Sequence, residues 1–99
     1  MVMVKVLTDA TVRPARAPGI VSVRLFAGAA EAAGVRVHRV PIEDGTTVDE
    51  VFDRMAEQFP ALAAMKSSLK FAVNHEFVEM DQRLSDGDEM AVIPPVSGG

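Results

Sequence analysis

The chain has 99 residues, of which 48% are hydrophobic and 24% charged, the proportions of one ordinary globular domain. Its formal net charge of −4 argues against nucleic acid or an anionic membrane as the main partner, because both attract basic surfaces. The absence of cysteine excludes disulfides and cysteine-ligated metal sites, and it fits a reducing compartment. Since the sequence also lacks the pattern of a signal peptide and the apolar length of a transmembrane helix, we expect a cytoplasmic protein.

The first 19 residues differ in composition from the rest of the chain. Residues 1–7 alternate enough for a short strand, whereas residues 8–19 combine turn formers, two prolines and two arginines, as linkers do. We therefore predict an N-terminal extension or linker over residues 1–19, a folded domain over residues 20–93, and a flexible C-terminal tail over residues 94–99 that ends in Gly-Gly.

The first elements of the predicted domain are two strands joined by a short helix. From Ile20 on, one set of alternating side chains is Val21, Val23 and Leu25 and the other is Ser22, Arg24 and Phe26, which predicts a half-buried strand. The alanine-rich run 29–33 suits a short helical turn that Gly34 ends. Residues 35–40 predict a second strand that ends at Pro41, so the two strands are expected to pair as a hairpin.

The clearest helix starts after Thr47. Thr47 followed three residues later by Glu50 is the pattern of a capping box. An apolar stripe with helical spacing then predicts one buried face, formed by Val48, Val51, Phe52, Met55 and Phe59. Pro60 is expected to end this helix.

The remaining elements are short. Residues 61–66 suit one more helical turn, and residues 69–74 and 77–78 predict a third and a fourth strand around a tight turn. The acidic turn Asp86-Gly87-Asp88 precedes a last strand over residues 89–93. This order predicts an α+β fold, a mixed five-stranded sheet covered on one face by one main helix plus short helical turns.

Alternation along the strands also assigns side chains to the two faces of the sheet. The residues expected to face the main helix are Val21, Val23, Leu25, Phe71, Val73, Met90 and Val92. Phe26, Ala72, Ala91 and Ile93 then point to the other face. Exposed apolar side chains such as Phe26 and Ile93 indicate an interface, unless the N-terminal extension packs on them. Arg24 shares this face, either as an ordinary surface residue or as a partner for an acidic group.

The chain ends in Pro94-Pro95-Val96-Ser97-Gly98-Gly99, with the terminal carboxylate on Gly99. The prolines end sheet pairing, and the two glycines have the narrowest cross-section a peptide offers, so this tail suits insertion into a partner's active site. A terminal carboxylate is ionised and unreactive at neutral pH, so another enzyme must activate it, for instance as an acyl adenylate. The alternative interpretation is a frayed terminus without a role.

We expect no catalytic constellation and no metal site within the domain. His38 and His75 have no obvious acidic or nucleophilic partner in the sequence, so we interpret both as solvated surface residues. The acidic cluster near the end of the domain is interpreted as a turn and its flanks, at Asp81, Asp86, Asp88 and Glu89.

These segments together resemble the small subunits of molybdopterin synthase, a family of ubiquitin-like β-grasp sulfur carriers, over about residues 21–99. The residues that carry the resemblance are Val23-Arg24-Leu25-Phe26-Ala27, Glu31-Ala32-Ala33-Gly34, Gly45-Thr46-Thr47-Val48, Phe59-Pro60-Ala61-Leu62, Ala72-Val73-Asn74, Leu84-Ser85-Asp86-Gly87-Asp88-Glu89 and Ile93-Pro94-Pro95-Val96-Ser97-Gly98-Gly99. The terminal block is the most specific of them. The 19-residue extension is not part of the family pattern.

The resemblance implies a particular chemistry at the chain end. An E1-like adenylyltransferase and sulfurtransferase would use ATP to adenylate the carboxyl of Gly99, next to Gly98, and convert it to a thiocarboxylate. The large subunit of the synthase would then take the tail into its active site, where sulfur passes to a pterin precursor of the molybdenum cofactor. The implied partner-binding residues are Arg24, Phe26, Ala91, Ile93, Pro94, Pro95, Val96 and Ser97. The chain would donate sulfur without being catalytic alone, and would hold no metal and no permanent cofactor.

Three other functions are compatible with the same residues. Carriers of sulfur for thiamine, cysteine or tRNA thiolation also end in Gly-Gly, although the Pro-Pro-Val-Ser spacing favours the synthase subunit. A ubiquitin-like modifier would form isopeptide bonds to lysines and give conjugates of higher mass. A binding domain with an inert tail would keep its activity without Gly98 and Gly99.

Overall fold

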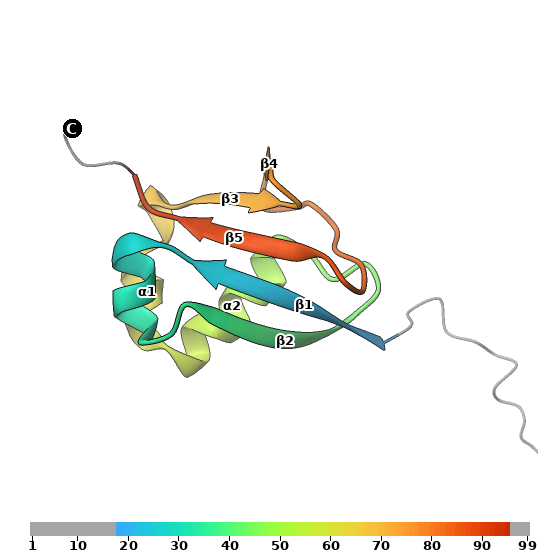
Figure 1. The fold of residues 1–99 in the computed structure, drawn as a ribbon, viewed down its shortest axis with the longest axis horizontal. Helices are drawn as coiled ribbons and strands as arrows, with labels where there is room; N and C mark the ends of the chain where they lie inside the picture. The colour runs from blue at the N-terminus through green and yellow to red at the C-terminus, as the bar shows by residue number, and fades with distance from the viewer. Residues whose placement is uncertain (1–17, 96–99) are drawn as a thin grey trace, which may run out of the picture.

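The structure is a computed structural model, and it describes residues 18–95. Most of the predicted N-terminal extension (residues 1–17) and the end of the predicted tail (residues 96–99) lie outside the described residues. The elements in chain order, shown in Figure 1, are the strand β1 (Pro18–Leu25), the helix α1 (Ala27–Ala33), the strand β2 (Val37–Glu43), the helix α2 (Val48–Gln58), the 3-10 helix η2 (Pro60–Ser68), and the strands β3 (Lys70–Val73), β4 (Glu76–Val78) and β5 (Glu89–Ile93).

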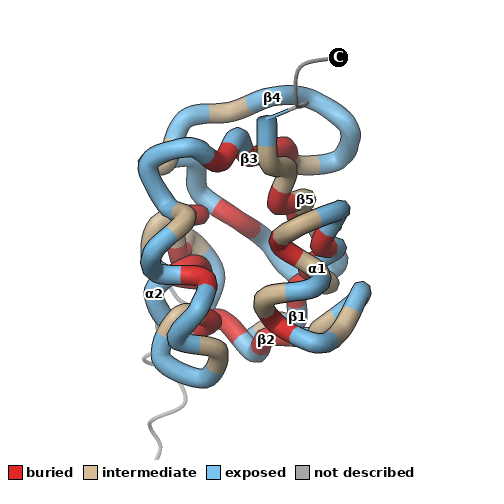
Figure 2. Tube along the Cα trace, turned by 90° about the vertical axis from the view of Figure 1, so that its left-hand side faces the viewer, coloured by how far each residue is buried: buried red, intermediate tan, exposed pale blue. Residues whose placement is uncertain are grey.

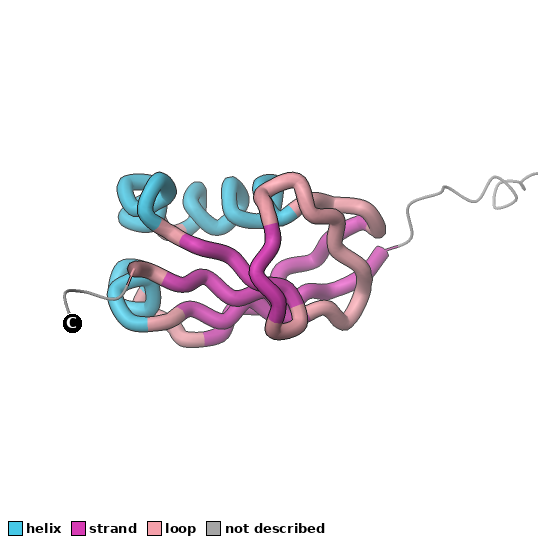
Figure 3. The backbone as a smooth tube through the Cα atoms, turned by 90° about the horizontal axis from the view of Figure 1, so that it is seen from above, coloured by secondary structure: helices cyan, strands magenta, loops and turns pink. Residues whose placement is uncertain are grey.

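The five strands form one mixed sheet in the order β2-β1-β5-β3-β4. The central strands β1 and β5 are parallel, whereas the other three pairs are antiparallel. Figure 3 shows α2 and η2 as a layer over one face of the sheet, and Figure 1 shows α1 at the end of the sheet where β5 ends. The opposite face carries no helix among the described residues. This arrangement confirms the predicted α+β fold.

The predicted capping box begins α2. The Thr47 hydroxyl accepts the N–H of Glu50 at 3.2 Å, and the Glu50 carboxylate accepts the N–H of Thr47 at 2.9 Å. These two bonds satisfy N–H groups that the first turn of a helix leaves without partners. Four residues of the predicted stripe are buried, whereas Phe59, the C-terminal cap, is half-buried. Pro60 begins η2 and so separates the two helices.

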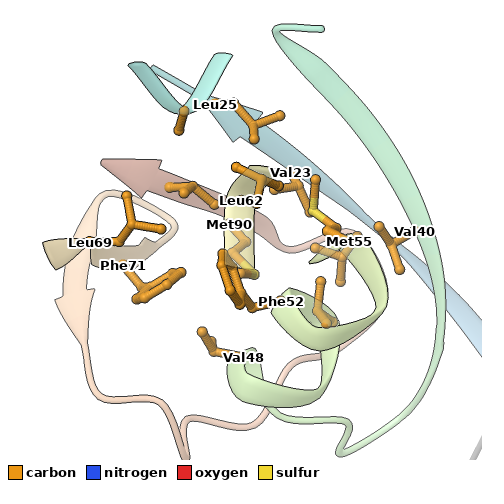
Figure 4. Packing of buried hydrophobic residues seen from close by; sticks show 14 of the residues in the cluster. Val23, Leu25, Val40, Val48, Phe52, Met55, Leu62, Leu69, Phe71 and Met90 are labelled. Atoms are coloured by element: carbon orange, nitrogen blue, oxygen red, sulfur yellow. The ribbon is translucent and has the colours of Figure 1, made fainter. Parts of the chain in front are cut away.

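The hydrophobic core lies between the sheet and the layer of α2 and η2, as Figures 2 and 4 show. Its largest fully buried side chains come from two helices, one strand and one loop: Phe52, Met55, Leu62, Met90 and Leu84. The rings of Phe52 and Phe71 meet edge to face, with their centroids 5.4 Å apart. Because each such side chain contributes about 1.5–3 kcal/mol when fully buried, this core fixes α2 and η2 on the sheet.

The strand β2 runs through Pro41, where the sequence predicted its end. Pro41 pairs with Ile20 of β1, and β2 is the edge strand of the sheet. An edge position tolerates proline because no further strand needs its missing N–H. A guanidinium N–H of Arg54 from α2 donates to the Pro41 carbonyl oxygen at 2.7 Å. Pro41 and Arg54 therefore make this edge a poor template for another strand.

The strand β1 begins at Pro18, two residues before its predicted start. The acidic turn explains this start, because the Asp86 carboxylate accepts the N–H of Ile20 at 2.8 Å and the Ile20 carbonyl accepts the N–H of Gly87 at 2.9 Å. Gly19 lies against the turn so closely that an added Cβ would be 2.7 Å from the Cβ of Asp86. The turn thus fixes the first residues of the sheet.

The prediction for the two histidines is wrong at His38. His38 is half-buried, and its ring meets Phe59 edge to face at 5.3 Å between centroids, so it packs between β2 and the end of α2. His75 lies in the turn between β3 and β4, and its side chain is 86% exposed, as predicted. Within residues 18–95 we find no helix long and apolar enough to cross a membrane.

Candidate functional site

One row of residues crosses all five strands on the open face of the sheet, the face opposite α2 and η2. The pairing of the strands places Val37, Arg24, Ala91, Ala72 and Phe77 side by side, from β2 to β4. Directly opposed residues of neighbouring strands point to the same face. The predicted side-chain directions of Arg24, Ala72 and Ala91 agree with this register.

A shallow hollow of about 220 Å³ lies on this face. It is lined by Arg24, Phe26, Ala72, His75, Phe77, Glu89, Ala91 and Ile93. Phe26 is 43% exposed and Phe77 is 71% exposed, whereas the alanines have no atoms beyond Cβ. The two large aromatic side chains therefore flank a depression that the small alanine side chains leave on the sheet, and an apolar side chain of a partner could insert there.

The sequence located four of the residues that line this hollow as partner-binding residues, namely Arg24, Phe26, Ala91 and Ile93. It did not identify Phe77, which is more exposed than Phe26. The position of Phe77 depends on its register with Ala72, and that register depends on a turn in which Asn74 and His75 both have positive φ, 51° and 74°. The sequence contains a signal for this turn, because Asn favours positive φ, but the pairing of Phe77 with Ala72 can be predicted only once the turn type is known.

Three polar side chains lie at one side of the hollow. A guanidinium N–H of Arg24 donates to the Glu89 carboxylate at 3.3 Å, and the Nε2 atom of His75 lies 3.6 Å from the other Glu89 oxygen. The guanidinium of Arg24 also lies 6.0 Å from the centre of the Phe26 ring, in cation–π range. An exposed ion pair of this kind contributes about 0–1 kcal/mol, so a partner's carboxylate can replace Glu89 beside Arg24 with little loss of free energy.

The chain leaves the sheet directly beside this hollow. The last paired residue of β5 is Ile93, which faces Lys70, and Pro94 and Pro95 follow without further pairing. The N–H of Phe26 donates to the Val92 carbonyl at 3.2 Å, which holds the start of α1 against the end of β5. The prediction that the prolines end the sheet is confirmed. Val96, Ser97, Gly98 and Gly99 lie outside the described residues, and their roles stay predictions.

The acidic residues of the turn before β5 have structural partners. The Asp86 carboxylate accepts a backbone N–H from β1, and that of Asp88 accepts the N–H of Ser85 at 2.8 Å and an amide N–H of Asn74 at 3.0 Å. Between Pro18 and Pro95, no group of three or more His, Asp or Glu side chains is placed to hold a metal ion. These carboxylates stabilise the turn.

The fold and the site define a class of protein, a ubiquitin-like β-grasp domain with an apolar hollow on its open face, beside the end of β5. The chain belongs to the ThiS family, whose profile matches residues 23–99. The molybdopterin synthase sulfur carrier subunit of Escherichia coli is 39% identical over 82 residues, which cover 81% of this chain and all of that protein. These matches confirm the family resemblance.

Solved structures confirm the β-grasp fold. The crystal structure of SAMP1 from Haloferax volcanii superposes with a TM-score of 0.74 at 32% sequence identity, covering 82% of this chain and all of that one. A complex of subunits 1 and 2 of the molybdopterin-converting factor from Helicobacter pylori contains a chain with a TM-score of 0.60. That chain is 22% identical and covers 81% of this chain and 99% of itself, so its likeness concerns the fold alone.

Proposed function

We propose that this chain is the sulfur carrier subunit of molybdopterin synthase, and that it carries sulfur as a thiocarboxylate on Gly99. The observation that supports the proposal most directly is the placement of an apolar hollow beside the point where a Pro-Pro-Val-Ser-Gly-Gly terminus leaves the sheet. A partner that docks on the hollow receives the tail at the same time. Six extended residues reach about 20 Å, enough to enter a buried active site.

The proposed chemistry takes place on the terminal carboxyl group. A carboxylate oxygen of Gly99 attacks the α-phosphorus of ATP in an E1-like enzyme, and pyrophosphate leaves. Hydrosulfide supplied by the sulfur source at the activating enzyme then attacks the acyl carbon, the bond from that carbon to the AMP oxygen breaks, AMP leaves, and the product loses its proton to give a thiocarboxylate. A thiocarboxylate is a soft nucleophile that is anionic at neutral pH, so it needs no general base from this chain. The proposal assigns catalysis to the partners and places the carrier in the cytoplasm, where ATP is available.

The open face and the tail base have the role of docking surface in this proposal. Phe26, Ala91 and Ile93 provide apolar contact, Arg24 provides a charge, and Pro94 and Pro95 direct the tail away from the sheet. One tail enters one active site at a time. The activating enzyme and the large subunit, which holds the pterin precursor, therefore bind the same surface in turn.

Intact-mass spectrometry tests the proposal. The protein is incubated with ATP, the E1-like enzyme of the same organism and a sulfur source, and then treated with a thiol-alkylating reagent. Because the chain has no cysteine, we expect the mass gain of one oxygen-to-sulfur exchange and a single alkylation that maps to Gly99. A chain without Gly99 is the control. An unchanged mass with an enzyme that is active on a known carrier would contradict the proposal.

The likeness to SAMP1, the small archaeal modifier protein 1 of Haloferax volcanii, favours a second candidate, a protein modifier joined to lysines through Gly99. The two candidates share the adenylate and differ in the acceptor. Conjugates of higher mass in extracts, with an isopeptide bond at Gly99, would support the modifier. A thiocarboxylate whose sulfur reaches a thiamine, cysteine or tRNA product instead of the pterin would assign the carrier to one of those pathways.

A further inference from the structure

A second, larger apolar hollow lies around the edge of the sheet from the open face. This groove of about 880 Å³ runs between η2 and the short edge strand β4. Its walls include the exposed Ala63 and Ala64 of η2, and its inner side includes Phe71, which is 5% exposed, and the half-buried Met80. Small exposed residues above an apolar inner surface leave space for side chains of another molecule.

The groove is continuous with the hollow on the open face. Phe77 lines both of them. The strand β4 ends at Val78, which is paired with Phe71 of β3, so Lys70 of β3 has no partner in β4. Lys70 lines the groove, and on its other side it is paired with Ile93 of β5. The two hollows therefore share Phe77, and Lys70 of the groove is paired with Ile93, which lines the open-face hollow.

Three charged side chains line the groove, Lys66, Lys70 and the exposed Glu79, and of these Lys70 favours an acidic group of a partner. Lys66 is already occupied, since its ammonium lies 2.8 Å from an Asp49 oxygen and 3.5 Å from an Asp53 oxygen. Lys70 is exposed, and within residues 18–95 its side chain makes no ion pair or hydrogen bond. A carboxylate of a partner placed beside Lys70 would form an ion pair with it, near the side of the groove that faces the open-face hollow.

The size of the open-face hollow also indicates that a partner contacts more of the molecule. A specific interface takes about 20–30 residues and about 800 Å² from each partner. The hollow is lined by eight residues, and the tail adds few more. Two other hollows share lining residues with it, one beside α1 at Arg24 and Phe26 and the groove at Phe77, and the groove has the more apolar lining.

We propose that the groove between η2 and β4 is a second contact site for the large subunit, which reaches around β4 with an apolar segment and places a carboxylate beside Lys70. This inference rests on the proposed function, because it takes the large subunit as the partner of the open face. Phe77 would then be enclosed by the partner from both sides.

A pair of alanines on η2 provides the test. Ala64 lines the groove, whereas Ala61 is exposed on the same helix and lines neither hollow. The dissociation constant of the full chain for the large subunit of the same organism is measured by titration calorimetry. We expect Ala64→Arg to weaken binding about tenfold or more, the range of a well-placed interface residue, and Ala61→Arg to bind within about twofold of the parent. Lys70→Glu should weaken binding and reduce its dependence on salt.

The outcomes separate this inference from the proposed function. Thiocarboxylate formation on Gly99 tests the carrier role without the groove, and Phe26→Asp tests the open face. Normal binding of Ala64→Arg together with weakened binding of Phe26→Asp would overturn the groove and leave the docking face in place. Weakened binding of Ala64→Arg to the activating enzyme alone would overturn the large subunit as occupant. Ser67→Arg, at another exposed position of the groove, replaces Ala64→Arg where circular dichroism shows a loss of folding.

Discussion

The backbone of Phe26 makes structural hydrogen bonds, whereas its side chain is exposed on the surface. Its N–H donates to Val92 at 3.2 Å and its carbonyl accepts the N–H of Ala29 at 3.0 Å, so the backbone joins β5 to the first turn of α1. The side chain lies on the open face, 43% exposed. A substitution that keeps the backbone bonds therefore changes the surface and leaves the core intact.

The first prediction concerns this residue. Phe26→Asp places a charge in an apolar contact, so we expect binding to the large subunit and to the activating enzyme to weaken about tenfold or more. The free energy of unfolding should change by less than about 0.5 kcal/mol, as for other surface positions. Ala61→Asp, at an exposed position of η2 that lines no part of the open-face hollow, is the control for binding. Equal affinities for the parent and both variants would refute the docking face.

At the scale of elements, the start of β1 depends on the turn that precedes β5. Asp86 and Gly87 bond to the N–H and the carbonyl of Ile20, although the two segments are 66 residues apart. Gly19 allows this contact because its neighbour is the backbone and Cβ of Asp86, at 2.9 and 2.7 Å from where a Cβ would lie. A substitution that displaces the turn therefore also displaces the start of β1.

The second prediction compares two glycines. Gly19→Ala forces the turn away from β1, and we expect the free energy of unfolding to fall by about 1–3 kcal/mol, as for other overpacked sites. Gly28→Ala is the control, because its Cβ would meet nothing closer than the Met65 methyl at 3.5 Å and alanine favours the helix. Urea denaturation of both variants measures the difference. A Gly19→Ala variant as stable as Gly28→Ala would mean that the turn adapts without strain.

The two covering helices are linked by an ion pair. Lys66 of η2 contacts Asp49 and Asp53 of α2 at the surface of the molecule. The hydrogen bond to Asp49 is the largest of the effects that raise the pKa of Lys66 above 10.5, and desolvation opposes it in part while the charges of Asp49 and Asp53 add to it. The charged form is therefore favoured in the folded state.

The third prediction is a pH dependence. A base with a raised pKa in the folded protein stabilises it fully below the unfolded pKa, here about 10.5, and this stabilisation is lost as the pH rises through the folded pKa. We expect carbon-detected NMR titration of Lys66 to give a pKa above 10.5, and Asp49→Asn to lower it. Asp44→Asn, at an exposed carboxylate outside this ion pair, is the control. A Lys66 pKa that is insensitive to Asp49→Asn would contradict the assigned cause.

In the whole molecule, folding and chemistry occupy different parts of the chain. The buried cluster extends from Val21 to Val92 among the described residues, whereas the carboxyl group that we propose to carry sulfur is on Gly99. Stability should therefore respond to the core and sulfur transfer to the tail.

The fourth prediction separates the two. Deletion of Gly98 and Gly99, or extension of the chain beyond Gly99, should abolish thiocarboxylate formation and sulfur transfer while the free energy of unfolding stays within about 0.5 kcal/mol. Leu62→Ala should do the reverse, with a loss of about 2–5 kcal/mol of stability and a normal thiocarboxylate below its melting temperature. Mass spectrometry and thermal denaturation measure both variants. Transfer by the truncated chain would contradict the assigned role of Gly99.

Most elements of the fold were predictable from local signals. The capping box at Thr47, the apolar stripe of α2 and the end of β5 before Pro94 each depend on residues within a few positions of one another. Family resemblance, supported mainly by the terminal block, added the β-grasp topology, and the role of Gly99 that it implies stays a proposal. Half of the lining of the open-face hollow was also predicted for binding, because alternation along a strand fixes which side chains share a face.

Tertiary structure decided the features that join distant segments. The place of β2 at the sheet edge lets the strand pass through Pro41, and the approach of α2 half-buries His38 against Phe59. The register of β4 on β3 places Phe77 between the hollow and the groove. Sequence periodicity reports the direction of a side chain relative to its own strand. Which neighbour that side chain meets depends on strand order and register, which the packing of the whole chain determines.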